Sequence, residues 1–427
     1  MNPDLEADNE SILLPSVTES LTTSHKERIL NRIWGFELPT TSRVAKYKGF
    51  LEHYESQVTE EEHIDTIDAV IHTHGDILYF IDALKRNPQL SRSDLQKSLE
   101  LSARCSTITS GSSLETLRHL RELDTARAID SALATAVRIM YAVHLSTNSG
   151  RILVGQSATT WEASKSLETI LQETFPTHDL ADEPNSPIKA NKLRLRYLET
   201  HVDVQVVWTR HLPDHLKLDI GPRQKVLRVF ELASLLEMTY EVMSNEPYQL
   251  DLHHSLLKGC YAPEFLHETL RTIALLFPTQ DRQWLERKIN PRSRWFRIGR
   301  RESRQLDKRL SAPFKSHHGE TLHDRPLTTR RELFARYPHW AVRLHTIYAE
   351  AEDPTPVSWF GKWAERRKAA RHTFWLTFVG FMVAILFGIL ASILAAVQIW
   401  LSYCQWQGEN ASVVCRTPTQ PVISGSP

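Results

Sequence analysis

Three side chains that could bind a metal ion follow one another at two-residue spacing. His72, His74 and Asp76 form a His-x-His-x-Asp pattern, in which two imidazoles and a carboxylate can share a divalent ion. A hydrolase centre of this kind also needs a strand that ends at the motif and further histidine ligands. Ile77 stands where the metallo-β-lactamase pattern has its next histidine, and the flanking residues have a helical period. We therefore interpret the motif as part of a helix and predict no metal site.

Two other groups of chemically active residues have no ligand spacing that we can justify. One group is His253, His254, Cys260 and His267; the other is His317, His318, His323 and Asp324, beside a basic stretch, where a solvated or pH-sensitive surface is the better interpretation. No nucleophile elbow, phosphate-binding loop, dinucleotide fingerprint, Cys-x-x-Cys or kinase signature is present. The sequence therefore predicts no catalytic residue and no cofactor.

The composition favours a helical protein whose positive and negative charges balance. The chain has 427 residues, 51 Lys plus Arg and 51 Asp plus Glu, so there is no excess charge that would attract nucleic acid. There are 15 glycines, which argues against Gly-rich barrels and phosphate loops. We expect a mainly α fold and no nucleic-acid partner.

One uncharged stretch near the carboxyl end predicts a membrane span. No Asp, Glu, Lys or Arg occurs between Arg371 and Glu409, and a spanning helix needs about 20 apolar residues. We place one transmembrane helix at residues 373–402. A buried core helix, the alternative, would be shorter and would carry a polar stripe.

Charges beside the span predict its orientation, because an excess of Lys and Arg marks the cytoplasmic flank. The amino-terminal flank carries Lys362, Arg366, Arg367, Lys368 and Arg371, whereas the other flank carries Arg416. Residues 1–372 are therefore predicted to be cytosolic and residues 403–427 lumenal or extracellular, in the secretory pathway or plasma membrane.

The tail has two features of a non-cytosolic compartment. Asn410 begins a glycosylation sequon, and Cys404 and Cys415, which flank it, could close a small disulfide. The other two cysteines, Cys105 and Cys260, are predicted to be ordinary buried thiols.

Small side chains recur every four residues along the span, at Gly380, Ala384, Gly388, Ser392 and Ala396. Such a face lets helices approach closely in lipid, and it predicts self-association or a partner helix. The alternative is that small residues are simply frequent in spans.

The rest of the chain divides into four further segments. We predict a disordered acidic N-terminus over 1–25 and a helical cytosolic domain over 26–280. Its helices include one beginning near Ser91 and others over 129–141, 161–175, 231–243 and 263–276. Two alternating stretches, 202–208 and 226–230, predict a small antiparallel β ribbon, with a helical turn at 212–216 between them. Residues 327–348 are predicted to form one helix, within a 327–372 segment that ends in a basic, aromatic juxtamembrane stretch.

A basic linker is predicted over 281–326. Residues 282–309 hold eleven Lys or Arg against Glu286, Glu302 and Asp307. A solvated linker, an anionic-lipid contact and a nucleic-acid contact are the three interpretations. The residues predicted to contact anionic lipid are Arg292, Arg294, Arg297, Arg300, Arg301 and Arg304, together with Lys362, Arg366, Arg367 and Lys368. Ser303 follows Arg300-Arg301-Glu302 and is a candidate phosphosite.

Residues 190–405 resemble a group of uncharacterised single-pass membrane proteins of filamentous ascomycete fungi. The resemblance rests on Trp208-Thr209, Leu212, His215-Leu216, the stretch 268–278, Tyr337, Trp340, Arg343-Leu344, Pro354, Trp359, Trp363, Arg366-Arg367, Phe374-Trp375, Gly388 and Gln398. The chain departs from the group's Trp-Trp-x-Asp-Arg-Arg pattern at Phe360-Gly361 and Ala364-Glu365. The resemblance implies a fungal source and one carboxyl-terminal span, but no activity.

The sequence thus predicts a C-terminally anchored protein whose cytosolic domain is an interaction or scaffolding module. Its expected partners are the bilayer, a second copy or partner helix through the span, and an unknown cytosolic protein. The alternative is an anchored enzyme that acts on a membrane-proximal substrate.

Overall fold

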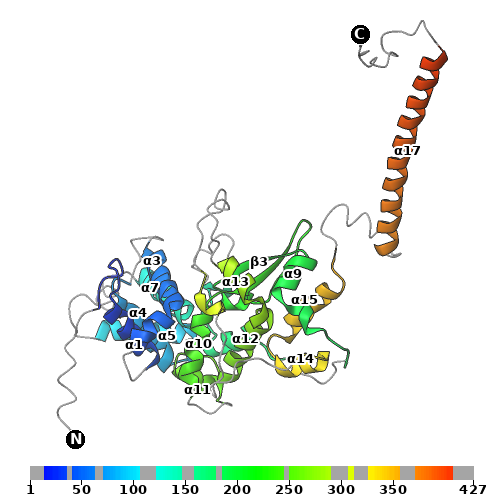
Figure 1. The fold of residues 1–427 in the computed structure, drawn as a ribbon. Coiled ribbons are helices and arrows are strands. Elements are labelled where there is room, and N and C mark those ends of the chain that lie inside the picture. The colour runs from blue at the N-terminus through cyan, green and yellow to red at the C-terminus, as the bar shows by residue number, and fades with distance from the viewer. Residues whose placement is uncertain are drawn as a thin grey trace, which may run out of the picture. The chain divides into compact units, whose positions relative to one another are not determined.

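The computed structural model is mainly helical, with two small sheets and one long apolar helix near the carboxyl end, which confirms the predicted fold class (Figure 1). It describes residues 14–35, 41–62, 71–105, 122–146, 158–178, 185–244, 250–289, 306–311, 326–355 and 371–406. The chain divides into two compact units, Met1–Thr355 and Pro356–Pro427. We call the described part of the first unit the body.

Helices occupy the amino-terminal part of the body. They are α1 (Thr23–Trp34), α2 (Thr41–Lys46), α3 (Lys48–Glu62), α4 (His74–Arg86), α5 (Arg92–Cys105) and α7 (Glu122–Tyr141). A two-residue parallel ladder, β1 (Leu145–Ser146) with β2 (Thr159–Thr160), follows. These helices gather at one end of the body in Figure 1, and the apolar face of α7 lies against α3, α4 and α5.

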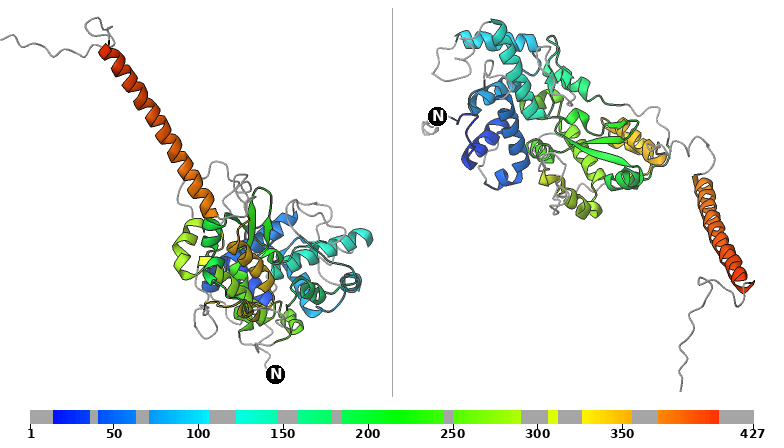
Figure 2. Two further views of the ribbon diagram at one scale, coloured as in Figure 1. Left: turned by 90° about the vertical axis from the view of Figure 1, so that its right-hand side faces the viewer. Right: turned by 90° about the horizontal axis from the view of Figure 1, so that it is seen from above.

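Strands and further helices form the rest of the body, and α10 and α11 lie against the amino-terminal helices (Figure 2). In chain order they are α8 (Leu167–Thr174), η2 (Ala190–Leu193), α9 (Leu195–His201), β3 (Val204–Thr209), η3 (Leu212–Asp214), β4 (Leu218–Ile220), β5 (Lys225–Phe230), α10 (Ala233–Met243), α11 (Leu252–Leu257), α12 (Pro263–Leu276), η4 (Thr279–Asp281), α13 (Arg282–Ile289), η6 (Lys308–Ser311), α14 (Arg330–Arg336) and α15 (Ala341–Glu352).

The two predicted strands exist, but the antiparallel pairing predicted for them was wrong. β3 and β5 run parallel, with Val204 opposite Lys225, and β4 is the strand that pairs antiparallel with β5. The order β3-β5-β4 makes β5 the central strand, and its Leu227 and Val229 are fully buried. The helical turn predicted at 212–216 is present as η3.

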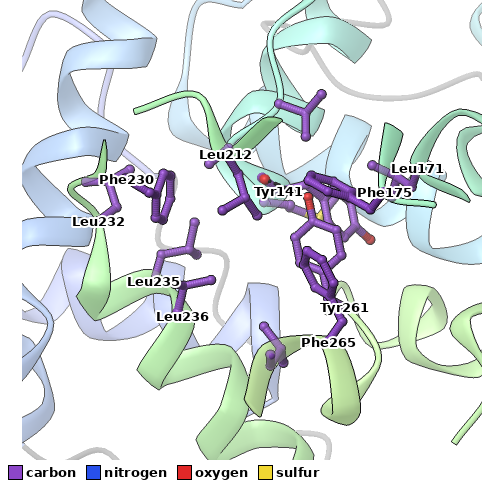
Figure 3. Close-up of a cluster of buried hydrophobic side chains, with 14 of the residues drawn as sticks. Tyr141, Leu171, Phe175, Leu212, Phe230, Leu232, Leu235, Leu236, Tyr261 and Phe265 are labelled. Atoms are coloured by element: carbon purple, nitrogen blue, oxygen red, sulfur yellow. Dashed lines mark hydrogen bonds between the residues drawn. The ribbon is translucent and has the colours of Figure 1, made fainter. Parts of the chain in front are cut away.

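Aromatic side chains from distant segments close the middle of the core (Figure 3). Tyr141, Phe175, Tyr261 and Phe265 converge there, and Phe265 lies 4.8 Å, centroid to centroid, from both Phe175 and Tyr261. The Tyr261 hydroxyl donates to the Tyr141 carbonyl at 2.9 Å. Burying rings of this size contributes much of a core's stability, and the buried hydroxyl has the partner that it needs.

The body extends beyond both ends of the predicted 26–280 domain. At the amino end, Ser16 forms a β-bridge with Thr73, and Val17 is buried. The predicted disorder over residues 1–25 is therefore wrong for residues 14–25. At the other end, Pro187 bridges to Thr329. Residues 326–355 therefore belong to the same unit and are not part of a separate juxtamembrane segment.

Two predicted helices have different bounds. The helix predicted over 161–175 begins only at Leu167, where Ser166 caps it by accepting from the Thr169 amide at 3.2 Å. The helix predicted over 327–348 is two helices, α14 and α15, because Pro338 interrupts it.

The second unit contains one described helix, α17 (Arg371–Trp406). Its stretch Thr377–Trp406 is 30 residues long and apolar enough to cross a membrane, with none of it buried. At 1.5 Å per residue, this exceeds the roughly 30 Å of hydrocarbon in a bilayer. The structure thus extends the predicted span toward the carboxyl end.

Candidate functional site

The His-x-His-x-Asp motif is the start of α4 and forms a capping box. The Asp76 carboxylate accepts from the backbone amides of His72 and Thr73 at 3.0 and 2.8 Å, and the Thr73 hydroxyl accepts from the Asp76 amide at 3.3 Å. His72 is exposed, whereas His74 is buried and its Nδ1 lies 3.0 Å from the Tyr54 hydroxyl. Burial lowers the pKa of His74 to about 4. The Thr73 and Asp76 side chains thus cap the helix that the helical interpretation predicted, whereas His74 contacts α3.

The other candidate ligand groups do not converge in the part of the chain that the structure describes, where no group of three metal-ligating side chains is found. His253 Nδ1 contacts Glu168 at 3.2 Å, His267 stacks on Tyr240, and burial raises the pKa of the Cys260 thiol to about 12. Cys260 is a free buried thiol, as predicted. His317, His318, His323 and Asp324 lie outside the described residues.

The predicted small-residue face lies along α17. An added Cβ at Gly380 or Gly388 would meet no atom within 4 Å, so both glycines are open to an approaching helix. The Ser392 hydroxyl donates to the Gly388 carbonyl at 2.9 Å, which satisfies this polar group within the helix. Ala384 and Ala396 lie on the same face by the helical period.

The predicted lipid-contact and modification residues fall outside the described ranges. These are Arg292, Arg294, Arg297, Arg300, Arg301, Arg304, Ser303, Lys362, Arg366, Arg367, Lys368, Asn410 and Cys415. Cys404, at the end of α17, is disulfide-bonded, and its pairing with Cys415 stays a prediction. Both ends of the basic segment belong to the body, which corrects the predicted linker over 281–326. Leu285 in α13 and Leu310 in η6 are buried, and α13 contacts η6.

A polar cluster that sequence reasoning missed lies at the carboxyl ends of the parallel strands β3 and β5. We call it the strand-end cluster and define it as His53, Ser56, Arg138, His144, Arg210, His211 and Glu231. Arg210 directly follows β3 and Glu231 directly follows β5. The Arg210 guanidinium donates from Nε to Glu231 Oε1 at 2.7 Å and from Nη1 to the Ser56 hydroxyl at 2.9 Å. Arg210 therefore joins helix α3 to the sheet.

Two histidines complete this cluster from the other side. The His144 backbone amide donates to His211 Nδ1 at 3.0 Å, and the two rings meet edge to face at 5.1 Å. Since Nδ1 accepts, the proton of neutral His211 is on Nε2. Burial lowers the pKa of His211 to about 4. The backbone at Ala142, which accepts from the Leu212 amide at 2.8 Å, is left-handed with φ 52°.

His53, on α3, is the most buried member of the cluster. It is fully buried, and its ring interacts with the backbone of Arg138 on α7. Burial lowers the pKa of His53 well below its usual value, and the nearby guanidiniums of Arg210 and Arg138 lower it further. The ring is therefore neutral and offers one N–H donor and one acceptor.

The cluster draws on four segments that are far apart in the sequence. His53 follows Phe50 and Leu51 in a helix, and Arg210 and Glu231 each stand one residue beyond a strand. The position of polar residues just after two strands was the available signal, but it has meaning only if the strands are parallel, because parallel strands end at the same edge.

A second buried charge pair lies where the body ends. Lys225 Nζ is 2.7 Å from Glu350 Oε1, and the two side chains are 2% and 6% exposed. Lys225 also donates to the Val202 carbonyl at 3.1 Å. Glu350 Oε1 accepts from the Thr355 amide and hydroxyl at 2.8 and 2.9 Å. This pair fixes the last described residue of the body to the central strand.

No family model, curated protein or solved structure matches this chain. The resemblance to fungal membrane proteins therefore stays a prediction.

Proposed function

We propose that this protein is a C-terminally anchored membrane protein whose body is a cytosolic interaction or scaffolding module. The observation that carries the proposal is α17. Its stretch Thr377–Trp406 is apolar and unburied, and an exposed apolar surface of this size is stable when lipid or a partner covers it. The body is compact by itself and has its own core.

The orientation rests on the flanking charges. The amino-terminal flank has five basic residues between Lys362 and Arg371, and this excess favours retention of that side in the cytosol. On the opposite side, the disulfide-bonded Cys404 fits an oxidising compartment. Asn410 is in the same tail and would be glycosylated there.

Partner binding by the body can be tested by proximity labelling. A labelling enzyme is fused to the amino terminus of the full chain and, as a control, to residues 356–427 alone. We expect a set of cytosolic proteins that is enriched with the full chain and absent from the control. Identical sets of labelled proteins would contradict the interaction module, because the anchor alone would explain them.

We propose that the small-residue face of α17 associates with a second copy. Gly388→Leu places a branched side chain where close approach needs none, and we expect at least a fivefold loss of self-association in membranes. The control is Val397→Leu, on the opposite face, which should leave association unchanged. Energy transfer between tagged chains in vesicles measures both. Association that is insensitive to Gly388→Leu would remove this proposal.

We also propose that the basic segment 290–305 contacts anionic lipid. It has six arginines and Glu302, with Trp295 and Phe296 among them, and each basic residue near such a surface contributes about 1 kcal/mol. A peptide of this segment should bind vesicles that contain phosphatidylserine much more than neutral vesicles. Phosphorylation at Ser303 should weaken the contact. Equal binding to both vesicles would end the lipid proposal.

A further inference from the structure

The last described residue of the body has an exposed hydroxyl next to a proline. Thr355 is exposed to solvent, and Pro356 follows it in the sequence. A proline disfavours helical backbone at the residue before it and favours an extended conformation. An exposed hydroxyl in such a segment, with proline next in the chain, is the feature that proline-directed protein kinases select in a substrate.

Four Ser-Pro or Thr-Pro pairs occur in the sequence. Thr417 and Ser426 are in the carboxyl-terminal tail, whereas Ser186 and Thr355 belong to the body, which the proposed orientation places in the cytosol. Ser186 is exposed as well, and its carbonyl accepts from the Arg330 amide at 2.8 Å. Ser186 therefore offers a matched comparison for Thr355 in the same unit.

The Thr355 hydroxyl contacts a carboxylate that is almost fully buried. Glu350 Oε1 accepts from this hydroxyl at 2.9 Å, from the Thr355 amide at 2.8 Å and from Lys225 Nζ at 2.7 Å. A carboxylate oxygen has about two lone pairs, so the ammonium and the amide satisfy Oε1 even when the hydroxyl is lost. The hydroxyl thus joins the solvent-exposed surface directly to the buried pair of Lys225 and Glu350.

The charges around this hydroxyl determine what a phosphate would do there. Three carboxylates, Glu350, Glu352 and Asp353, closely precede it in the chain. The cations that pair with them are Lys225, with Glu350, and Lys192, which lies 3.4 Å from Glu352. The carboxylates thus outnumber their paired cations before any modification. A phosphothreonine adds a charge of about −1.5 to −2 at pH 7 and disrupts structure next to Asp or Glu.

We propose that Thr355 is a phosphorylation site for a proline-directed protein kinase, and that its phosphate loosens the carboxyl end of the body. The kinase transfers the γ-phosphoryl group of ATP to Thr355 Oγ1, where the new P–O bond replaces the O–H bond, ADP leaves and a proton is released. Repulsion between the phosphate and Glu350 then breaks the contact that holds Thr355 at the end of α15. The proposal rests on the proposed cytosolic placement of the body, because the kinase and ATP are in the cytosol.

The test uses the purified full chain in detergent micelles, so a wrong orientation in cells would not change its outcome. The chain is incubated with Mg-ATP and a mitogen-activated protein kinase, and peptide mass spectrometry locates the phosphate. We expect phosphate at Thr355 in the wild type and none at this position in Thr355→Val. Amide hydrogen exchange over residues 350–355 should become about tenfold faster after phosphorylation, because the end of α15 opens more often.

Matched substitutions separate repulsion at Glu350 from the effect of added charge alone. Thr355→Glu and Ser186→Glu introduce the same acidic side chain at two exposed residues that precede a proline. Thr355→Glu should accelerate exchange over 350–355, whereas Ser186→Glu should leave it unchanged. Thr355→Val removes only the hydroxyl, so it should have a smaller effect than Thr355→Glu.

Two results would overturn the proposal on the phosphorylated chain: no phosphate at Thr355, or exchange over 350–355 that is the same with and without the phosphate. Equal effects of Thr355→Glu and Ser186→Glu on this exchange would also overturn it, because the contact with Glu350 would then have no part in the response.

Discussion

Replacing Lys225 by methionine is expected to destabilise the body by about 3–5 kcal/mol, because it leaves the Glu350 carboxylate buried without its cation. The two groups are 2.7 Å apart and almost fully buried. Glu350 keeps its hydrogen bonds from Thr355, but those donors are neutral. Glu350→Gln should have a comparable effect, since it leaves a buried ammonium whose remaining partner is the Val202 carbonyl.

The double variant separates the interaction energy between Lys225 and Glu350 from the effect of losing either residue alone. Lys225→Met with Glu350→Gln removes both charges, so its loss should be much smaller than the sum of the single losses. The matched control is Lys288→Met, whose partner Glu199 lies 2.8 Å away at the surface. That pair should contribute at most about 1 kcal/mol. Urea unfolding of the full chain in detergent measures the free energy of unfolding for all four variants. If the Lys225 and Glu350 single variants lose no more stability than the control, the expected cost of leaving one buried charge unpaired is contradicted.

Acid is expected to destabilise the body steeply below pH 6.5. Burial lowers the pKa of His74 and His211 to about 4 and of His215 to about 3, and it lowers the pKa of His53 well below its usual value. Unfolded histidines take up protons near pH 6.5, while these four stay neutral in the folded chain. Their contribution is therefore fully present above pH 6.5 and is lost as the pH falls toward the folded pKa values.

The size of the acid effect follows from proton linkage. His74, His211 and His215 should each contribute a loss of about 1–2 kcal/mol between pH 6.5 and pH 5, or about 3–6 kcal/mol together, and His53 adds to this loss. His53→Phe should flatten the dependence only in part. His72→Gln, at an exposed position, should leave it unchanged. Free energies of unfolding in urea at several pH values measure this, and a flat profile from pH 7 to pH 5 would refute it.

Local signals in the sequence were sufficient for several elements. α12 has the predicted bounds because Pro263 is favoured in the first turn of a helix and Pro278 cannot continue one. The apolar run of α17 needs no tertiary context, because hydrocarbon favours any uncharged helix of this length. The Thr73–Asp76 capping box likewise involves residues only three apart.

The errors concern choices that local patterns do not contain. A two-residue period identifies β3 and β5 as strands, but it is the same for parallel and antiparallel pairs. Trp161 was included in a helix on periodicity alone, although its indole donates to the Lys165 carbonyl at 3.0 Å in a turn before the Ser166 cap. The strand-end cluster depends on the parallel pairing of β3 with β5, so it could not be found before the strand directions were known.

The account depends most directly on α17 lying in a bilayer. Extraction of membranes with alkaline carbonate tests this, using the full chain and a variant that lacks residues 371–427. We predict that the full chain stays with the membrane pellet and the variant appears in the supernatant. Release of the intact full chain into the supernatant would contradict the account.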